Sequence, residues 1–459
     1  MRSNPYWMDR QQHRLPLTLL LAYGCIALPL STIGLPLSIY LAPFYSGELG
    51  LPLALLGTAM VLARLVDIIV DPAIGVISDR WRPAVGRRKI WLPIGVSLLV
   101  LGAWMLFQPE KGVGIVYFFL WTTVMYVGFT ATKLPYEAWG AELSSDYAER
   151  TRITTFRQGY SLIGLVVATL VPAYVLMREG ATTADVLAGM SWIVIGILPL
   201  AAILTFFTVP DTSPVEAKSG ESLWRQWRPL WRNGPFRIIA LALLIAYIAE
   251  TARVTITLFF ARDAIGVENI GAVYVYYFVA GLAGVPVWGW LGNRMGKHRA
   301  LFLAFALLFI INGAMYFLEH GQTALFTALF IAKGLCFGAL ELLPAAMIAD
   351  TVDIDVARTK RHRQGLFFAV IGIVMKLGQA LGQGLSLNLL GLIGFAAAGG
   401  NGETELAGLR LVYVILPNIM LLVSLWLLSR YALTAARHGR LRAAIERRER
   451  TATARPATP

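Results

Sequence analysis

The chain has 459 residues, of which 57% are hydrophobic and 15% are charged, and its formal net charge is +13. Soluble proteins carry about 25% charged residues, so this composition excludes an ordinary soluble domain. The apolar residues come in blocks of about 20, the length that a helix needs to cross a bilayer. We therefore predict an all-α polytopic membrane protein.

Twelve apolar segments are the predicted transmembrane helices. They cover residues 16–44, 50–78, 90–108, 113–141, 157–178, 187–209, 237–262, 268–292, 300–319, 323–349, 364–393 and 407–431. The longest hydrophilic stretch between them separates six segments from six. The predicted organisation is a cytoplasmic arm (1–15), a six-helix bundle (16–209), a cytoplasmic loop (210–236), a second six-helix bundle (237–431) and a basic, partly disordered cytoplasmic tail (432–459).

The placement of the positive charges predicts the orientation. With both termini in the cytoplasm, 31 of the 40 Lys and Arg residues lie on the cytoplasmic side, and only Lys111, Arg178, Arg262 and Arg410 lie on the other. This is the distribution that the positive-inside rule describes. Membrane insertion therefore explains the basic charge better than nucleic-acid binding does. We expect a monomer in a cell membrane, such as the bacterial inner membrane.

The first span contains three prolines, Pro29, Pro36 and Pro43, together with Gly34. Proline removes hydrogen bonds within a helix, and the freed carbonyl groups are tolerated in a membrane where they face a cavity. We therefore expect a kinked helix that lines a cavity, although Gly and Pro are frequent in membrane helices generally.

The second span carries two carboxylates, Asp67 and Asp71, in an otherwise apolar run. Residues four apart share one face of a helix. A charged side chain at the bilayer centre costs about 3 kcal/mol even on the lenient insertion scale, and two neighbouring carboxylates repel unless a proton or a cation relieves them. The pair predicts a site for a cation, a proton or a buried ion pair.

A short motif recurs at the end of spans 2 and 8. The first copy is Gly75-Val-Ile-Ser-Asp79-Arg80 followed by Gly86-Arg87-Arg88, and the second is Gly289-Trp-Leu-Gly292-Asn293-Arg294 followed by Gly296-Lys297. Repeated halves suit alternating access, in which one bundle rocks against the other. We interpret the charged residues as cytoplasmic gate ion pairs. The alternative is that the Gly-rich segments are ordinary turns.

Four further charges lie within the spans of the second half. Glu250 and Arg253 are three apart, so they can pair on one helix face. Lys333 and Glu341 are eight apart in span 10. We expect Lys333 to extend toward the membrane interface, as long basic side chains do near helix ends, and Glu341 to line the cavity.

The motif set resembles the glycoside–pentoside–hexuronide:cation symporters, the melibiose-permease group of the major facilitator superfamily. The resemblance rests on segments in both halves: Arg64-x-x-Asp67-x-x-x-Asp71-Pro72-x-x-Gly75-x-x-x-Asp79-Arg80, Leu134-Pro135-Tyr136, Gly140-Ala-Glu142-Leu143, Phe156-Arg157, Pro344-Ala-Ala-Met347-Ile-Ala-Asp350-Thr-Val-Asp353, and Lys376 in span 11. It implies twelve transmembrane helices in two pseudo-symmetric halves, and secondary transport of a small solute by alternating access.

The resemblance also implies residue roles. Asp67 and Asp71 would face the coupling cation, sodium or a proton, with Lys376 close by, while Arg64 and Arg157 would lie near the substrate. The predicted gate residues are Asp79, Arg80, Arg87, Arg88, Glu142, Asp350, Asp353, Arg361 and Arg363.

The chain departs from melibiose carriers at their sugar-binding positions. Lys133 stands where they have an Asp that touches both sugar and cation site, Glu137 and Glu341 stand where they have Trp, and Ser31 lies near their span-1 Asp. These four residues complete the predicted substrate site. We hypothesise that the Lys133 ammonium sits beside the aspartates and takes part in coupling, which would weaken sodium dependence. The alternative is that Lys133 only neutralises an aspartate while sodium still binds.

Three functions remain open at this stage. The first is cation-coupled transport of a sugar, glycoside or sugar acid, and the second is a lysophospholipid carrier of the same family or a proton-coupled or uncoupled carrier of a charged solute. The third is a membrane enzyme or a sensor. The five His residues lie in loops or tails, so no nucleophile–base set is evident within the spans. We therefore expect no enzyme activity and no cofactor.

Overall fold

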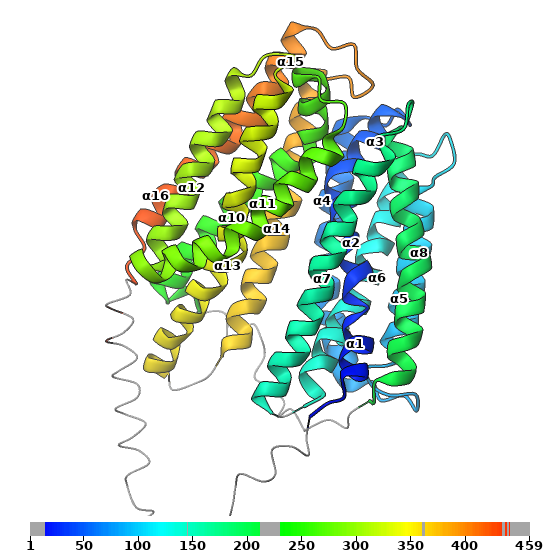
Figure 1. The fold of residues 1–459 in the computed structure, drawn as a ribbon, viewed down its shortest axis with the longest axis vertical. Helices are drawn as coiled ribbons and strands as arrows, with labels where there is room; N and C mark the ends of the chain where they lie inside the picture. The colour runs from blue at the N-terminus through cyan, green and yellow to red at the C-terminus, as the bar shows by residue number, and fades with distance from the viewer. Residues whose placement is uncertain are drawn as a thin grey trace, which may run out of the picture. The chain divides into compact units, whose positions relative to one another are not determined.

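The computed structural model describes residues 14–144, 146–211, 230–359 and 363–433, together with Arg437 and Arg440. Across these residues the regular structure is helical (Figure 1). Most of the predicted arm, central loop and tail lie outside the described residues, as does the predicted gate residue Arg361.

Eleven helical segments of the described chain are long and apolar enough to cross a membrane, and the helix Trp91–Phe107 is apolar but shorter, at 17 residues. In chain order the helices are α1 (Leu17–Gly24), α2 (Ala27–Thr32), α3 (Leu41–Gly47), α4 (Leu53–Arg80), α5 (Trp91–Phe107), α6 (Ile115–Glu142), α7 (Tyr147–Val175), α8 (Thr183–Thr208), α10 (Gly234–Phe259), α11 (Ile270–Met295), α12 (Lys297–Ala314), α13 (Thr323–Thr359), α14 (Gln364–Ile393), α15 (Glu403–Arg410) and α16 (Leu416–Ser429). Short π or 3-10 turns are Pro36–Tyr40, Phe260–Ile265, Met315–Phe317 and Leu411–Ile415. The prediction of an all-α polytopic membrane protein is confirmed.

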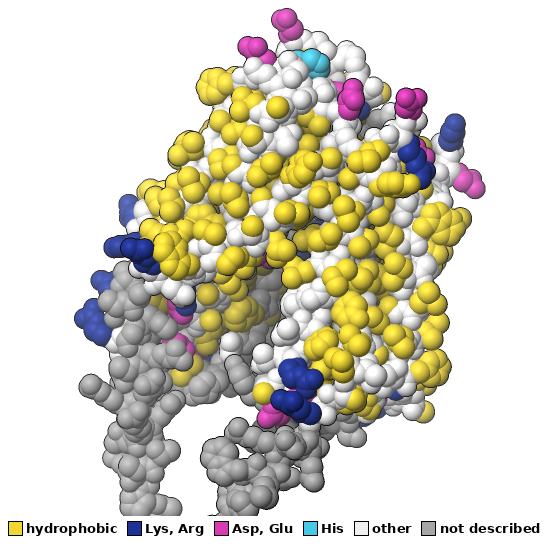
Figure 2. Space-filling view, in the orientation of Figure 1, with side chains coloured by type: hydrophobic (Ala, Val, Ile, Leu, Met, Phe, Trp, Pro, Cys, Tyr) yellow, Lys and Arg dark blue, Asp and Glu magenta, His cyan; other side chains and the backbone are white. Residues whose placement is uncertain are grey.

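Large apolar side chains are exposed along many of these helices. Ile69 is 73% exposed, Phe207 79% and Leu392 81%, and hydrophobic side chains cover much of the surface in Figure 2, with the charged ones concentrated near helix ends. Extended apolar surface of this kind marks a contact with a partner or a membrane. It fits helices whose outer faces contact lipid.

The chain forms two compact units. Unit 1 is drawn from Met1–Leu51 and Leu62–Ala217, and unit 2 from Pro52–Val61 and Lys218–Pro459. Helix α4 therefore begins in unit 2 and continues into unit 1. Each unit is a bundle of helices (Figure 1), and the two are described separately below.

The first membrane segment of unit 1 is broken, as its prolines predict. It consists of α1, α2, the π turn Pro36–Tyr40 and α3, which together form one candidate membrane span, Leu17–Gly47. Two hydroxyls in α2 bond to carbonyl groups of their own helix: Ser31 donates to Ala27 at 2.7 Å and Thr32 donates to Pro29 at 2.7 Å. Such bonds from Ser and Thr to a preceding turn help to bend membrane helices.

Close contacts fix this broken segment against α6 and α7. Tyr23 and Tyr136 stack with ring centroids 4.6 Å apart, and each hydroxyl donates to the backbone carbonyl of the other residue, at 3.1 and 2.8 Å. A side chain at Gly140 would collide with the Tyr23 hydroxyl, so glycine is required there.

The start of α7 is set by Asp146, which accepts hydrogen bonds from the backbone of Ala148 and Glu149, as an N-cap residue does.

Unit 2 has an extensive apolar core in which α10 is central. Small residues allow its close packing: Gly378 and Gly382 of α14 lie against the backbone of α10, and Gly338 of α13 lies against α11. Small residues at helix interfaces are the usual means of packing in membranes, where apolar burial does not distinguish helix from lipid.

Candidate functional site

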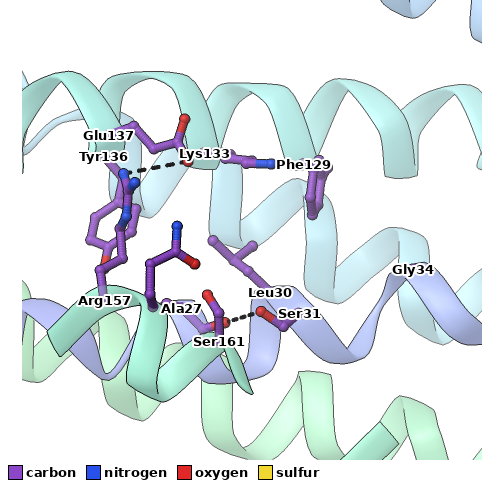
Figure 3. A pocket seen from close by; sticks show the side chains of 11 residues that line it. Ala27, Leu30, Ser31, Gly34, Phe129, Lys133, Tyr136, Glu137, Arg157 and Ser161 are labelled. Carbon is purple, nitrogen blue, oxygen red and sulfur yellow. Dashed lines mark hydrogen bonds and ion pairs between the residues drawn. The ribbon is translucent and has the colours of Figure 1, made fainter. Parts of the chain in front are cut away.

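A cavity of about 260 Å³ lies in unit 1 between the broken first segment, α6 and α7 (Figure 3). It is lined by Ala27, Leu30, Ser31, Gly34, Phe129, Lys133, Tyr136, Glu137, Arg157, Gln158 and Ser161. Four of the six predicted substrate-site residues, Ser31, Lys133, Glu137 and Arg157, therefore line a single space. The polar side chains converge on it from three helical segments, which is the general form of a small-molecule site.

Arg157 and Glu137 face each other across one end of this cavity. The guanidinium and carboxylate are 3.4 Å apart, and the side chains are 20% and 39% exposed (Figure 3). Arg157 comes from α7 and Glu137 from α6, so this ion pair joins two walls of the cavity. Because both groups remain accessible from the cavity, each is available to hydrogen-bond a solute there.

The Lys133 ammonium lies in the same cavity, 5.3 Å from the centre of the Phe129 ring. No ion pair joins it to a carboxylate within the described residues, Asp67 and Asp71 included. This differs from the hypothesis that Lys133 sits as a tethered cation between the aspartates. The physical reason is the direction of its side chain, which extends over Phe129 toward the cavity (Figure 3).

The two aspartates of α4 meet at one hydroxyl of α6. Thr130 Oγ1 lies 3.0 Å from Asp67 Oδ1 and 2.8 Å from Asp71 Oδ1. Asp67 and Thr130 are each 2% exposed. A hydroxyl has one hydrogen, so Thr130 donates to only one of the two oxygens at a time.

Arg64 completes this aspartate site instead of lining the cavity. Its guanidinium is 3.3 Å from Asp67 Oδ2 and 3.9 Å from the centre of the Tyr126 ring. An arginine over an aromatic face gains a cation–π interaction. Arg64 is absent from the lining of the unit 1 cavity, and its predicted place near the substrate stays a prediction.

Four predicted gate residues form one cluster at the end of α4. Arg88 donates to Asp79 at 2.7 Å and to Glu142 at 2.6 Å, and Arg87 lies 2.7 Å from Glu142. Arg88 is only 4% exposed. Burial lowers its pKa, but the hydrogen bonds and charges of Glu142 and Asp79 outweigh burial and raise the pKa above its usual value. We call these four residues the α4-end cluster.

The corresponding end of unit 2 holds a simpler pair. Lys297, at the start of α12, lies 2.7 and 2.8 Å from the two carboxylate oxygens of Asp350 on α13. Lys297 belongs to the repeated motif, whose charged residues we interpret as gate ion pairs, and its position after Gly296 matches that of Arg87 after Gly86. In both units, therefore, ion pairs join the repeated motif to a neighbouring helix. That helix is α6 in unit 1 and α13 in unit 2.

The other predicted gate residues are not part of these contacts. Arg80 is exposed, and neither Arg80 nor Arg363 forms an ion pair with a described carboxylate. Asp353 lies on α13, one turn beyond Asp350, and Lys376 lies on α14. Both keep their predicted roles as proposals.

Unit 2 contains a buried charge cluster that sequence reasoning described only in part. Glu250 lies 2.7 Å from Arg253, which confirms their expected pairing, and 3.0 Å from Lys333. Lys333 is 2% exposed, so the expectation that it extends to the membrane interface is wrong. The carboxylate on α10 attracts it inward. Glu341 lies two turns further along α13, exposed and without a hydrogen-bond partner among the described residues.

Thr130 is the residue of this site that sequence reasoning missed. It is a single hydroxyl in a span that contains several Thr residues, and nothing in its immediate neighbours marks it. Its one signal is its spacing: it lies three residues before Lys133, on the turn that faces α4.

A family model described as MFS/sugar transport protein matches residues 22–435 of the chain. The chain belongs to this family. Within it, the chain is a member of the glycoside–pentoside–hexuronide:cation symporter group, as the motifs predicted.

Among the relatives of this family member is an uncharacterized symporter of Synechocystis sp., 24% identical over 95% of this chain and 98% of the relative. The isoprimeverose transporter of Lactiplantibacillus pentosus is 23% identical, over 83% of this chain and 81% of the relative. The solved nucleoside transporter NupG has the same fold, with a TM-score of 0.66 at 13% identity over 91% of this chain and 100% of that chain. This major facilitator family member is a multi-pass membrane transporter and not an enzyme.

Proposed function

We propose that this protein is a cation-coupled symporter of an acidic sugar, such as a hexuronide or another sugar acid. The observation that carries the substrate class is the charge of the unit 1 cavity. Two cations, Lys133 and Arg157, face one carboxylate, Glu137. Glu137 is already paired with Arg157, so Lys133 is left to bind an anionic group of the solute.

The cavity wall also offers groups that could contact the uncharged part of such a solute. Ser31, Gln158 and Ser161 supply hydroxyl and amide groups to the cavity wall, and Phe129 and Tyr136 supply aromatic surface. Sugars present both hydroxyl groups and apolar ring faces. The relatives support a sugar because one of them carries the name of a transporter for isoprimeverose.

The proposed coupling site is the aspartate pair with Thr130. The hydroxyl contacts both carboxylates, so the two acidic groups lie close together, and a positive charge bound there would offset their mutual repulsion. We propose that this charge is the coupling ion, sodium or a proton. Lys376 would lie near it, as the family resemblance implies. Lys133 would bind the substrate and not the aspartates. It would then give no reason to expect weakened sodium dependence.

Three structural features extend the proposal. We propose that α5, whose 17 residues are at the lower limit for a span, also crosses the membrane and brings the number of spans to twelve in two pseudo-symmetric halves. We propose cytoplasmic termini from the positive-inside pattern. The α4-end cluster and the Lys297–Asp350 pair would then lie on the cytoplasmic side and serve as gates.

Uptake into proteoliposomes tests the substrate class. The probes are a radiolabelled hexuronate and the matching neutral hexoside, and the variants are Lys133→Met and Lys133→Arg. We expect hexuronate uptake to fall at least tenfold in Lys133→Met and to recover in part in Lys133→Arg. Lys111→Gln, an exposed loop variant, is the matched control. Preference for the neutral hexoside in the unchanged protein would refute an acidic substrate.

The same vesicles test the coupling. An inward sodium gradient and an inward proton gradient are imposed separately, and the gradient that stimulates uptake identifies the ion. Asp71→Asn is expected to abolish that stimulation while leaving exchange of substrate across the membrane measurable. Equal uptake with no gradient and with either gradient would contradict symport and leave facilitated diffusion.

A further inference from the structure

A groove of about 430 Å³ opens on unit 2 where α11 ends, α12 begins and α16 ends. Its walls are Met295, His298, Arg299, Phe302, Leu303, Ala306, Leu428, Ser429 and Tyr431. We call it the α12/α16 groove. It is distinct from the unit 1 cavity and shares no residue with it.

One end of the groove is apolar and continues a surface suited to lipid. Phe302 is 39% exposed, and beyond the groove Ile310 on α12 and Ile419 on α16 are 64% and 54% exposed. An apolar surface of this extent on a membrane transporter contacts acyl chains. The groove is therefore a recess in a lipid-facing surface.

The other end of the groove is basic and lies at the level of an interfacial belt. Trp290 and Trp426 mark this level, each with an arginine over its ring: Arg294 at 5.2 Å and Arg430 at 4.9 Å. Tryptophan beside basic residues is typical of the membrane–water interface. In Figure 2, Lys and Arg side chains border hydrophobic ones at this end of the unit.

Arg299 is the basic residue of the groove that lacks a carboxylate partner. It is exposed and forms no ion pair with a described residue, whereas nearby Lys297 is held by Asp350. The hydroxyl of Tyr431, a residue 6% exposed, has no hydrogen-bond partner in the described chain. The Tyr431 ring lies 6.0 Å from that of His298. A cation and two polar rings therefore stand at the basic end of the groove.

We propose that the α12/α16 groove binds one anionic phospholipid. Its phosphodiester would be bound at Arg299, next to His298 and Tyr431, and one acyl chain would lie along Phe302, Leu303 and Ala306. Charge complementarity selects this occupant, because Arg299 matches the phosphate and the apolar wall matches a chain. The sequence predicts this end to be cytoplasmic, and that leaflet carries the anionic lipids that basic pockets between helices recognise.

Native mass spectrometry of the purified full-length protein tests this site. The protein is stripped of lipid in a neutral detergent and titrated with phosphatidylglycerol or with phosphatidylcholine of the same acyl chains. We expect one phosphatidylglycerol to be retained in preference to phosphatidylcholine. In Arg299→Gln its affinity is expected to fall about fivefold, the contribution of one basic residue near a lipid surface.

Arg294→Gln is the matched control, because Arg294 lies at the same end of unit 2, is exposed and does not line the groove. It is expected to keep the phosphatidylglycerol affinity of the unchanged protein. Ala306→Phe, which fills the apolar wall, is expected to reduce retention of both lipids. Equal retention of the two lipids by the unchanged protein, no lipid retained at all, or an equal loss in Arg294→Gln and Arg299→Gln would each overturn the proposal.

Discussion

The two units arrange their intramembrane charges differently. In unit 1, Arg64 pairs with Asp67, and the Thr130 hydroxyl contacts both Asp67 and Asp71. In unit 2 a single carboxylate, Glu250, faces two cations, Arg253 and Lys333. The first group brings two carboxylates to one hydroxyl, and the second brings two cations to one carboxylate.

This difference fits our proposal that a coupling ion binds at the aspartates of unit 1, while the unit 2 group holds helices together. Arg253 is fully buried, and each of its three guanidinium nitrogens donates a hydrogen bond. The acceptors are Glu250 at 2.7 Å, the Tyr413 carbonyl at 3.1 Å and Asn418 at 3.3 Å. Such saturation is expected of a group that holds helices together. At the aspartate pair of unit 1, a single Thr130 hydroxyl contacts two carboxylates.

The largest effect is expected when the unit 2 carboxylate is removed. Glu250→Gln leaves two buried cations without their counter-charge, and breaking a buried pair in this way costs about 3–5 kcal/mol. We expect a large fall in thermal stability in detergent. Lys333→Met keeps the Glu250–Arg253 pair, so it is expected to change stability far less. A greater loss in Lys333→Met than in Glu250→Gln would contradict the charge balance described above.

A smaller effect is expected when the shared donor of unit 1 is removed. Thr130→Val keeps the shape of the side chain but leaves the buried Asp67 without this hydrogen bond, at a cost of about 1–3 kcal/mol. Thr130→Ser retains the hydroxyl and is expected to retain most of the stability. Ion-stimulated uptake should follow the same order. Full stimulation in Thr130→Val would show that the hydroxyl has no part in coupling.

Effects no larger than that of Thr130→Val are expected at the two end clusters, and they differ between units. Arg88→Gln removes a nearly buried guanidinium from both Asp79 and Glu142, so we expect a loss of about 1.5–3 kcal/mol, as for hydrogen bonds to charged groups. Lys297 is 37% exposed, and Lys297→Gln is expected to cost at most about 1 kcal/mol. Added salt should reduce the Lys297 contribution more. Equal losses in the two variants would show that burial does not separate the clusters.

Sequence reasoning located the cavity residues better than it located their partners. The family resemblance implies a substrate site that includes Ser31, Lys133, Glu137 and Arg157. These residues line one cavity because position in a motif fixes the helix face. The direction of a long side chain is not fixed in this way. Lys133 extends over Phe129, Arg64 turns to Asp67, and Lys333 turns inward to Glu250.

The partners themselves come from distant segments, which explains why they were missed. Thr130 is 59 residues from Asp71, and Lys297 is 53 residues from Asp350. Neither pairing has a local pattern, since each depends on how two helices face one another. The helical fold, by contrast, follows from apolar length alone, and the break in the first span follows from its prolines.

The single hydrogen of Thr130 has a consequence for the electrical nature of transport. Suppose that Asp67 and Asp71, which contact this hydroxyl, accept one added cation per cycle. Co-transport of that cation with a singly charged sugar acid then moves no net charge. With a neutral glycoside the same cation would carry one charge, and 100 mV would add about 2.3 kcal/mol, equivalent to about a 50-fold concentration ratio. The response of uptake to membrane potential would therefore report the charge of the solute that we propose Lys133 binds.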